Sequence, residues 1–194
     1  MKIKVILMTV VAAAALFVAS CGKKDAACCE KTAISVDSLM AIAPEIVGDT
    51  IEVDGLCSHL CKHGGRKAFL VGTDSTIVLR CESTAEMGGA FAPDCIGKTL
   101  AVTGVVCENR IGEAEVAAME ARQAAADSAS RAHEACATEK KAQGQDSIDS
   151  FEARMADYRA KIAARAEAEG KDYLSFYYIK AISYTVDTPA EQAE

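Results

Sequence analysis

Four side chains that can bind a soft metal ion recur at every second position of one short segment. Cys57, His59, Cys61 and His63 supply two thiols and two imidazoles. Alternate side chains of an extended strand point to the same face, so the spacing predicts four donors on one face. Sulfur and nitrogen donors together suit zinc or copper. The segment therefore predicts a transition-metal site on a β-hairpin.

The length of this segment limits how many of the four donors can bind one metal ion. Residues 57 to 63 would span about 20 Å if fully extended, which is too far for one tetrahedral ion to bridge. Neighbouring donors such as His59 and Cys61 could chelate together. The other ligands would then come from a bulge, from the glycine turn that follows, or from further thiols. The candidates for those further thiols are Cys81, Cys95 and Cys107.

Disulfides are the competing interpretation of the same residues. Nine Cys in 194 residues are many for a cytosolic protein and indicate export, metal binding or both. In a straight strand the Cα atoms of Cys57 and Cys61 would lie about 13 Å apart, too far for a disulfide without a bend. A thiol-redox enzyme is a minority alternative, because a C-x-x-x-C spacing differs from the C-x-x-C of that class.

The N-terminus indicates export to the cell envelope. Residues 1–20 combine a basic start at Lys2 and Lys4 with an apolar stretch too short to span a membrane. A small-residue run then ends at Cys21, as in a bacterial lipobox, which predicts Cys21 as the lipidated first residue of the mature chain. Several acyl chains would anchor the protein stably. We expect an extracytoplasmic lipoprotein at the periplasmic face or outer membrane, with residues 21–33 as a tether.

The charge balance restricts the partners. The chain has a formal net charge of −7, and removal of residues 1–20 would take away two lysines and no acid. Proteins that bind a nucleic-acid backbone carry a basic face, so no nucleic-acid partner is expected. The expected partners are the membrane, through the lipid anchor, and a protein of the envelope.

Five segments have the composition and alternation of β-strands, and they follow a capped helical turn after Ser35. Gly64 and Gly65 predict a two-residue hairpin turn between the first two strands, and Gly104 predicts a bulge. The expected strands are 50–63, 66–72, 76–81, 98–107 and 173–186.

Residues 113–169 have a helical composition, with no Pro and a single Gly. A break at Gly144 divides them, and the second half has a heptad spacing of apolar residues. The pattern predicts an antiparallel helical hairpin, 113–142 and 147–169, that ends at Gly170. The spaced residues are Ile148, Phe151, Met155, Tyr158 and Ile162.

The order of elements predicts a mainly β fold with an α insertion. A five-stranded OB-like barrel over 34–186 is the economical arrangement, because an open meander would leave long strand edges unpaired. The helical hairpin at 113–170 interrupts the barrel between its fourth and fifth strands. Residues 187–194 are expected to be a tail.

The lipobox, the strand order and the sequence GLCSHLCKHGGRKAFL at 55–70 resemble a group of Bacteroidetes-type OB-fold lipoproteins with a Cys/His-rich first hairpin. The resemblance covers roughly residues 50–111 and 172–186. It implies the fold and the location, and it implies no mechanism, because the group has no settled activity.

Two functions follow as hypotheses. The first is a non-enzymatic, membrane-anchored binding lipoprotein that holds zinc or copper on its first hairpin. The second is a structural or protein-interaction module of the envelope, with structural disulfides and no ligand. The chain has no nucleophile elbow, P-loop, H-E-x-x-H or dinucleotide motif, so an enzyme is not expected.

Overall fold

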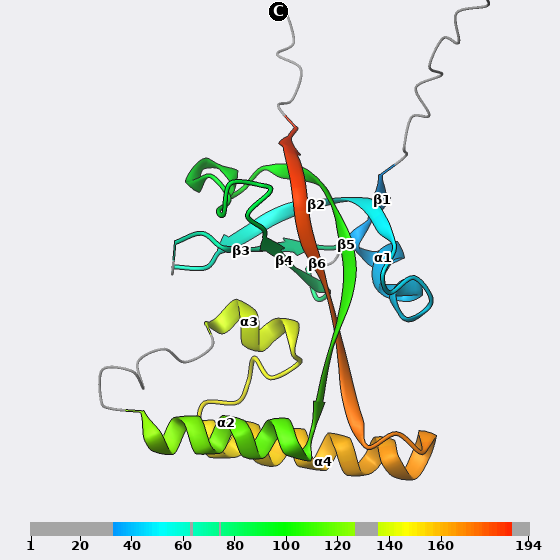
Figure 1. Ribbon diagram of the computed structural model, residues 1–194, viewed down its shortest axis with the longest axis vertical. Coiled ribbons are helices and arrows are strands. Elements are labelled where there is room, and N and C mark those ends of the chain that lie inside the picture. Colours follow the sequence, from blue (N-terminus) through cyan, green and yellow to red (C-terminus); the bar gives the residue numbers. More distant parts are fainter. Residues whose placement is uncertain (1–32, 63, 74, 127–135, 188–194) are drawn as a thin grey trace, which may run out of the picture. The chain divides into compact units, whose positions relative to one another are not determined.

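The computed structural model describes residues 33–62, 64–73, 75–126 and 136–187 (Figure 1). The signal-peptide prediction, the lipidation of Cys21 and almost all of the tether and tail predictions lie outside these ranges. In chain order the elements are β1 (Ile34–Ser35), α1 (Val36–Ile42), η1 (Ala43–Glu45), β2 (Thr50–Leu60), β3 (Lys67–Val71), β4 (Val78–Ser83), η2 (Pro93–Cys95), β5 (Thr99–Gly112), α2 (Glu113–Ala125), α3 (Ala137–Ala142), α4 (Phe151–Glu169) and β6 (Tyr173–Val186).

Five strands close into a barrel in the order β2-β3-β4-β6-β5, with β5 returning to pair with β2. Neighbouring strands are antiparallel except β4 and β6, which are parallel. The short β1 adds a parallel edge to β2. The predicted closed five-stranded barrel in a mixed helix and sheet protein is confirmed, and its strand order is consistent with an OB-like barrel.

Strand alternation fills the barrel. In β5, Leu100, Val102 and Val106 point inward and are buried, while Ala101, Thr103 and Val105, which alternate with the buried positions, are more exposed. The register with β6 shifts between Thr103 and Gly104. A Cβ on Gly104 would lie 2.4 Å from the Lys180 carbonyl oxygen, so the close approach of β5 and β6 requires glycine. The predicted bulge at Gly104 is confirmed.

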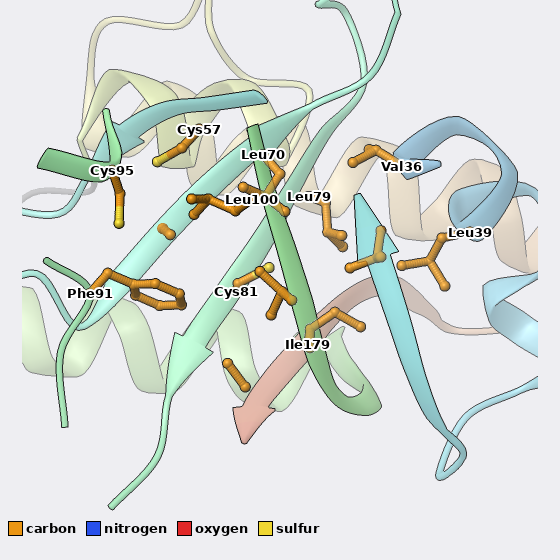
Figure 2. Close-up of a cluster of buried hydrophobic side chains, with 14 of the residues drawn as sticks. Val36, Leu39, Cys57, Leu70, Leu79, Cys81, Phe91, Cys95, Leu100 and Ile179 are labelled. Atoms are coloured by element: carbon orange, nitrogen blue, oxygen red, sulfur yellow. The ribbon is translucent and has the colours of Figure 1, made fainter. Parts of the chain in front are cut away.

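The helix α1 closes one part of the barrel core. Val36 and Leu39 are 1% exposed and pack with the inward side chains of the strands (Figure 2). The helix begins where expected, because the Ser35 hydroxyl accepts a hydrogen bond from the Ser38 N–H at 3.2 Å.

Beyond the barrel, β5 and β6 continue as a two-stranded ribbon. β2 pairs with β5 only as far as Val105, whereas β6 follows β5 to Gly112. The ribbon leads into α2 and α4, which lie side by side (Figure 1). A second apolar cluster joins these elements, and it includes the predicted heptad residues from Phe151 onward, whereas Ile148 precedes α4 and is not part of it. Its buried members are Ile111, Val116, Met155, Tyr158 and Ile162.

The expected helical hairpin is not confirmed in its predicted form. The first arm, 113–142, contains α2 and the separate α3, so with α4 the described residues between β5 and β6 form three helices. The second arm begins at Phe151 and not at residue 147, because Ser150 provides the N-cap: its hydroxyl accepts from the Ala153 N–H at 3.0 Å. It ends at Gly170, whose φ of 69° is left-handed, as predicted. Within the described residues, none of the helices has the length and apolar character of a membrane span.

Candidate functional site

The predicted metal donors do not share one face of the hairpin. The register between β2 and β3 shifts between Cys57 and His59, which face Leu70 and Phe69 respectively. Ser58 is therefore an extra residue that forms a β-bulge, and an extra residue reverses the alternation of the strand beyond it. Cys57 points into the core and is fully buried, whereas the His59 ring lies 5.8 Å from the Phe69 ring on the outside of the barrel. The prediction of a common face is wrong for these two residues.

Cys61 lies directly after β2. Its N–H donates to the Lys67 carbonyl at 2.8 Å, and its carbonyl accepts from Gly65 at 3.1 Å. The connection is thus longer than the predicted two-residue turn, although Gly64 and Gly65 both have positive φ as expected. His63 lies outside the described residues. In the described ranges, no three or more His, Cys, Asp or Glu side chains form an arrangement that could hold a metal ion.

Two of the three additional thiols join Cys57 inside the barrel. Cys57, Cys81 and Cys95 are all fully buried (Figure 2). Burial, reinforced by the Cys95 thiol, raises the pKa of Cys57 to about 11. Burial and the nearby Cys57 also raise the pKa of Cys81. Cys57 and Cys81 therefore stay protonated at neutral pH, and a protonated thiol is a poor nucleophile and a poor metal ligand.

The third additional thiol, Cys107, is separate from this group. It is partly buried on β5, and its thiol interacts with the Tyr178 hydroxyl of β6. Cys107 therefore does not complete a site with the other predicted donors.

The outer surface of β3 and β4, which we call the docking face, is covered by α3. Its apolar part consists of Phe69, Val71 and Val78, which are buried beneath Cys136 and Ala142 from the α3 segment. Figure 1 shows α3 beside these strands. The docking face thus contains an apolar strip on the outside of the barrel, and the α3 segment shields this strip from water.

Two cations border this strip and bind one carboxylate. Glu139 of α3 accepts from the Lys67 ammonium at 2.9 Å and from the Arg80 guanidinium at 2.7 Å. Burial opposes ionisation of Glu139, but the hydrogen bonds and charges of these cations outweigh it, and the pKa of the carboxyl lies below its ordinary value. Arg80 is itself positioned by the Tyr178 ring, 4.7 Å from its guanidinium carbon.

The helix α3 has little stability of its own. It has six residues, none of them is buried, and no side chain caps its N-terminus. Such a short helix is unstable in water, so its contacts must hold it in place. Besides Glu139, these include Gln143 at its C-terminal end, which accepts from Tyr158 of α4 at 2.8 Å.

Two buried side-chain nitrogens at the docking face form no hydrogen bond within the described residues, Nε2 of His59 and Nε of Arg80, although the latter lies 3.3 Å from the Glu82 carboxylate. Buried polar atoms are nearly always bonded, so the His59 nitrogen is available to a ligand. It lies next to the apolar strip that the two cations border.

Sequence reasoning missed the residues that bind Glu139. Arg80 is the only charged residue of the segment 76–81, and a charge inside an otherwise apolar strand was a usable signal. Glu139 is one of many acidic residues in its region, and nothing in its spacing distinguishes it.

The comparisons with known proteins add little. No protein-family model and no curated protein matches the chain. Among solved structures, the chain is similar to a protein assigned as an aspartyl-tRNA synthetase from Leishmania major Friedlin, with 23% identity and a TM-score of 0.28. The match covers 50% of this chain and 19% of that chain, so this chain matches about a fifth of that protein's length. A TM-score this low supports no argument about fold or function.

Proposed function

We propose that the protein is a membrane-anchored, extracytoplasmic binding lipoprotein, and that its docking face binds an acidic helical segment of a partner protein of the envelope. The observation that carries this proposal is the double contact of Glu139 with Lys67 and Arg80. The anchor rests on the lipobox at Cys21 and on the tether that follows it.

The chemistry of α3 describes the segment that the docking face accepts. Cys136, Glu139 and Ala142 are spaced three apart, so they lie along one side of a helix. Small side chains at both ends fit the apolar strip, and the carboxylate between them meets the two cations. A partner helix with a central acidic residue and small apolar neighbours would reproduce these contacts.

Displacement of α3 is the step that frees the docking face. The short helix depends on its charge contacts, on the packing of residues at its two ends and on the hydrogen bond between Gln143 and Tyr158. A partner with a longer, intrinsically more stable helix would form the same contacts at a lower conformational-entropy cost. The α3 segment thus acts as an internal competitor that sets the affinity for the partner.

A labelled peptide of residues 136–146 tests this proposal. In a Glu139→Lys variant the lysine repels Lys67 and Arg80, which releases the protein's own α3. The natural peptide should then bind to the variant in fluorescence anisotropy, while the unaltered protein, with its face occupied, binds much less. The charge-matched control is Glu152→Lys, an exposed position on α4, which should behave as the unaltered protein.

The same titration can contradict the proposal. Absence of binding to Glu139→Lys up to about 1 mM peptide would mean that the face contributes less than about 4 kcal/mol of affinity for its own segment. A face that weak is not a docking site. Circular dichroism of the variant checks that the barrel is still folded.

The second candidate function is transition-metal binding, and the unpartnered Nε2 of His59 favours it. The ligands would be His59 with Cys61 and His63 from the connection after β2. Cys57 cannot join them, because the bulge directs it into the core. Imidazole and thiolate donors of this kind suit zinc or copper.

Calorimetry with zinc chloride and with copper(I) tests this candidate. Binding should be lost in His59→Ala and kept in Cys107→Ser, because Cys107 lies elsewhere on the barrel. Equal heats for the unaltered protein and His59→Ala would remove the candidate. Elemental analysis of protein purified without added metal gives an independent reading.

A further inference from the structure

We propose that Cys57 and Cys95 form a disulfide that links β2 to η2 at one end of the barrel. The inference goes beyond the proposed function, since it concerns the interior of the barrel and not the docking face. It rests on the backbone geometry of two segments that lie far apart in the sequence.

The backbone at Cys57 is bonded to the segment that follows Cys95. The Cys57 N–H donates to the Lys98 carbonyl at 2.9 Å, and the Cys57 carbonyl accepts from Gly97 at 2.8 Å. The pairing continues the β2–β5 ladder past its last partners, Leu56 and Thr99. Cys57 and Lys98 are therefore direct neighbours on two adjacent segments of the chain.

A tight turn then brings Cys95 back over this pair. The Lys98 N–H donates to the Cys95 carbonyl at 3.1 Å. Ile96 has φ −62° and ψ 130°, and Gly97 has φ 79°, which are the angles of a type II turn. A type II turn holds its first and last Cα atoms within about 7 Å. The turn therefore holds Cys95 close to Lys98, which is the residue that pairs with Cys57.

Both thiols are inside the core. Cys57 and Cys95 are 0% exposed, and Figure 2 shows them on adjacent segments at the same end of the barrel. The Cys95 thiol is close enough to affect the ionisation of Cys57. Disulfides need Cα atoms about 4.4–6.8 Å apart, a range that this arrangement allows.

Cys81 is the competing partner for Cys57, and the sheet disfavours it. Cys81 lies on β4, which is separated from β2 by β3. Strands two places apart lie roughly 9–10 Å from each other, beyond the reach of a disulfide. The pair also differs in register, because Cys57 faces Leu70 whereas Cys81 faces Ala68.

Formation of the bond is a two-electron oxidation. Each thiol loses its proton, the sulfur atoms join, and the two electrons pass to an external disulfide, which is reduced to two thiols. The external disulfide is glutathione disulfide in the test below, or a protein dithiol oxidant in an oxidising compartment. Because both thiols become inaccessible in the closed barrel, the exchange must take place while the chain folds.

Peptide mapping tests the pair directly. The full chain is unfolded in reductant, refolded with reduced and oxidised glutathione, and alkylated in denaturant before digestion with trypsin. Trypsin leaves Cys57 in one peptide with Cys61, and Cys95 in one peptide with Cys81. The map is therefore made in a Cys61→Ser/Cys81→Ser background, where the expected product is one linked peptide pair that reductant separates.

Thermal unfolding gives the second reading. The oxidised protein should melt roughly 10 °C higher than the reduced protein, because the bond closes a long loop. Cys57→Ala and Cys95→Ala should each abolish this difference between oxidised and reduced samples, and Cys107→Ser should keep it. Comparison within each variant removes any effect of the substitution on the core itself.

Alkylated Cys57 and Cys95 in the refolded protein would overturn the inference, and so would a bond from Cys57 to Cys61 or Cys81 in the chain that keeps all its cysteines. The experiment is done in solution with glutathione, so its outcome does not depend on membrane anchoring or on the docking face. The proposed function and this inference can therefore fail separately.

Discussion

Glu139 is the residue on which the covering of the docking face depends. Its carboxylate is held by Lys67 and Arg80, and its pKa is lowered in the folded protein. A lowered folded-state pKa means that the contact adds stability above the unfolded value, near 4.3, and loses it as the pH falls through the folded value. Acid should therefore release α3.

Glu139→Gln tests this contact. We expect the free energy of unfolding in urea to fall by about 1–3 kcal/mol at pH 7, because the substitution removes charged hydrogen bonds. The difference between the two proteins should disappear as the pH falls through the lowered pKa of Glu139. Glu152→Gln is the exposed control. A difference that stays constant with pH would show that the charge of Glu139 is not what holds α3.

Gly104 controls the closest approach between two barrel strands. A Cβ at this position would meet the Lys180 carbonyl and the Ile179 side chain, at 2.4 and 2.5 Å. Gly104→Ala should lower the free energy of unfolding by about 1–3 kcal/mol through overpacking. The exposed Thr99→Ala on the same strand is the reference, and equal stability of the two variants would contradict the role given to the bulge.

Single residues also decide what the sequence can predict. Gly104 and Gly170 were predictable because glycine is required where backbones approach closely or take a left-handed conformation. The bulge at Ser58 was not, because nothing marks serine as an extra residue in a strand. That one residue separates Cys57 from His59 and removes the four-donor face.

At the scale of the elements, the apolar seam of α4 joins the helices to the β5–β6 ribbon. Met155 and Tyr158 are 1% exposed and pack against Val116 of α2. Arg159 of α4 adds charge contacts to Glu113 and Glu120 of α2. The packing, and not these exposed ion pairs, should supply most of the stability.

Met155→Ala measures the packing of the seam. The cavity left by the side chain should lower the free energy of unfolding by about 2–5 kcal/mol. Glu167→Ala, on the exposed side of the same helix, should have an effect within about 0.5 kcal/mol. If both variants lose equally little, the helices do not form a common core with the ribbon.

The helices show which features the spacing of apolar residues can predict and which it cannot. The heptad spacing of α4 was predictable because one face is buried against a continuous surface. The division of the first arm into α2 and α3 was not, because α3 is held by Glu139 and Gln143 through contacts with β4 and α4. Contacts between distant segments leave no local pattern.

At the scale of the whole molecule, the predicted lipid anchor would place the docking face at a membrane surface. The prediction rests on Cys21 and the stretch before it. The protein should partition with membranes, and Cys21→Ser should move it to the soluble fraction, because no acyl chains are then attached. Cys107→Ser controls for the loss of a thiol. A Cys21→Ser protein that still sediments with membranes would contradict the anchor.

If the docking face selects an acidic helix through Lys67 and Arg80, exchanging the charges on both sides should reverse its choice of peptide, and a binding titration measures this. Two proteins with a released α3 are compared, Glu139→Lys and the double variant Lys67→Glu/Arg80→Glu. Each is titrated with the natural 136–146 peptide and with the same peptide carrying Glu139→Lys. We expect the natural peptide to bind to the Glu139→Lys protein, and the altered peptide to bind to the Lys67→Glu/Arg80→Glu protein. Equal binding of both peptides to both proteins, or no binding to either, would contradict this expectation.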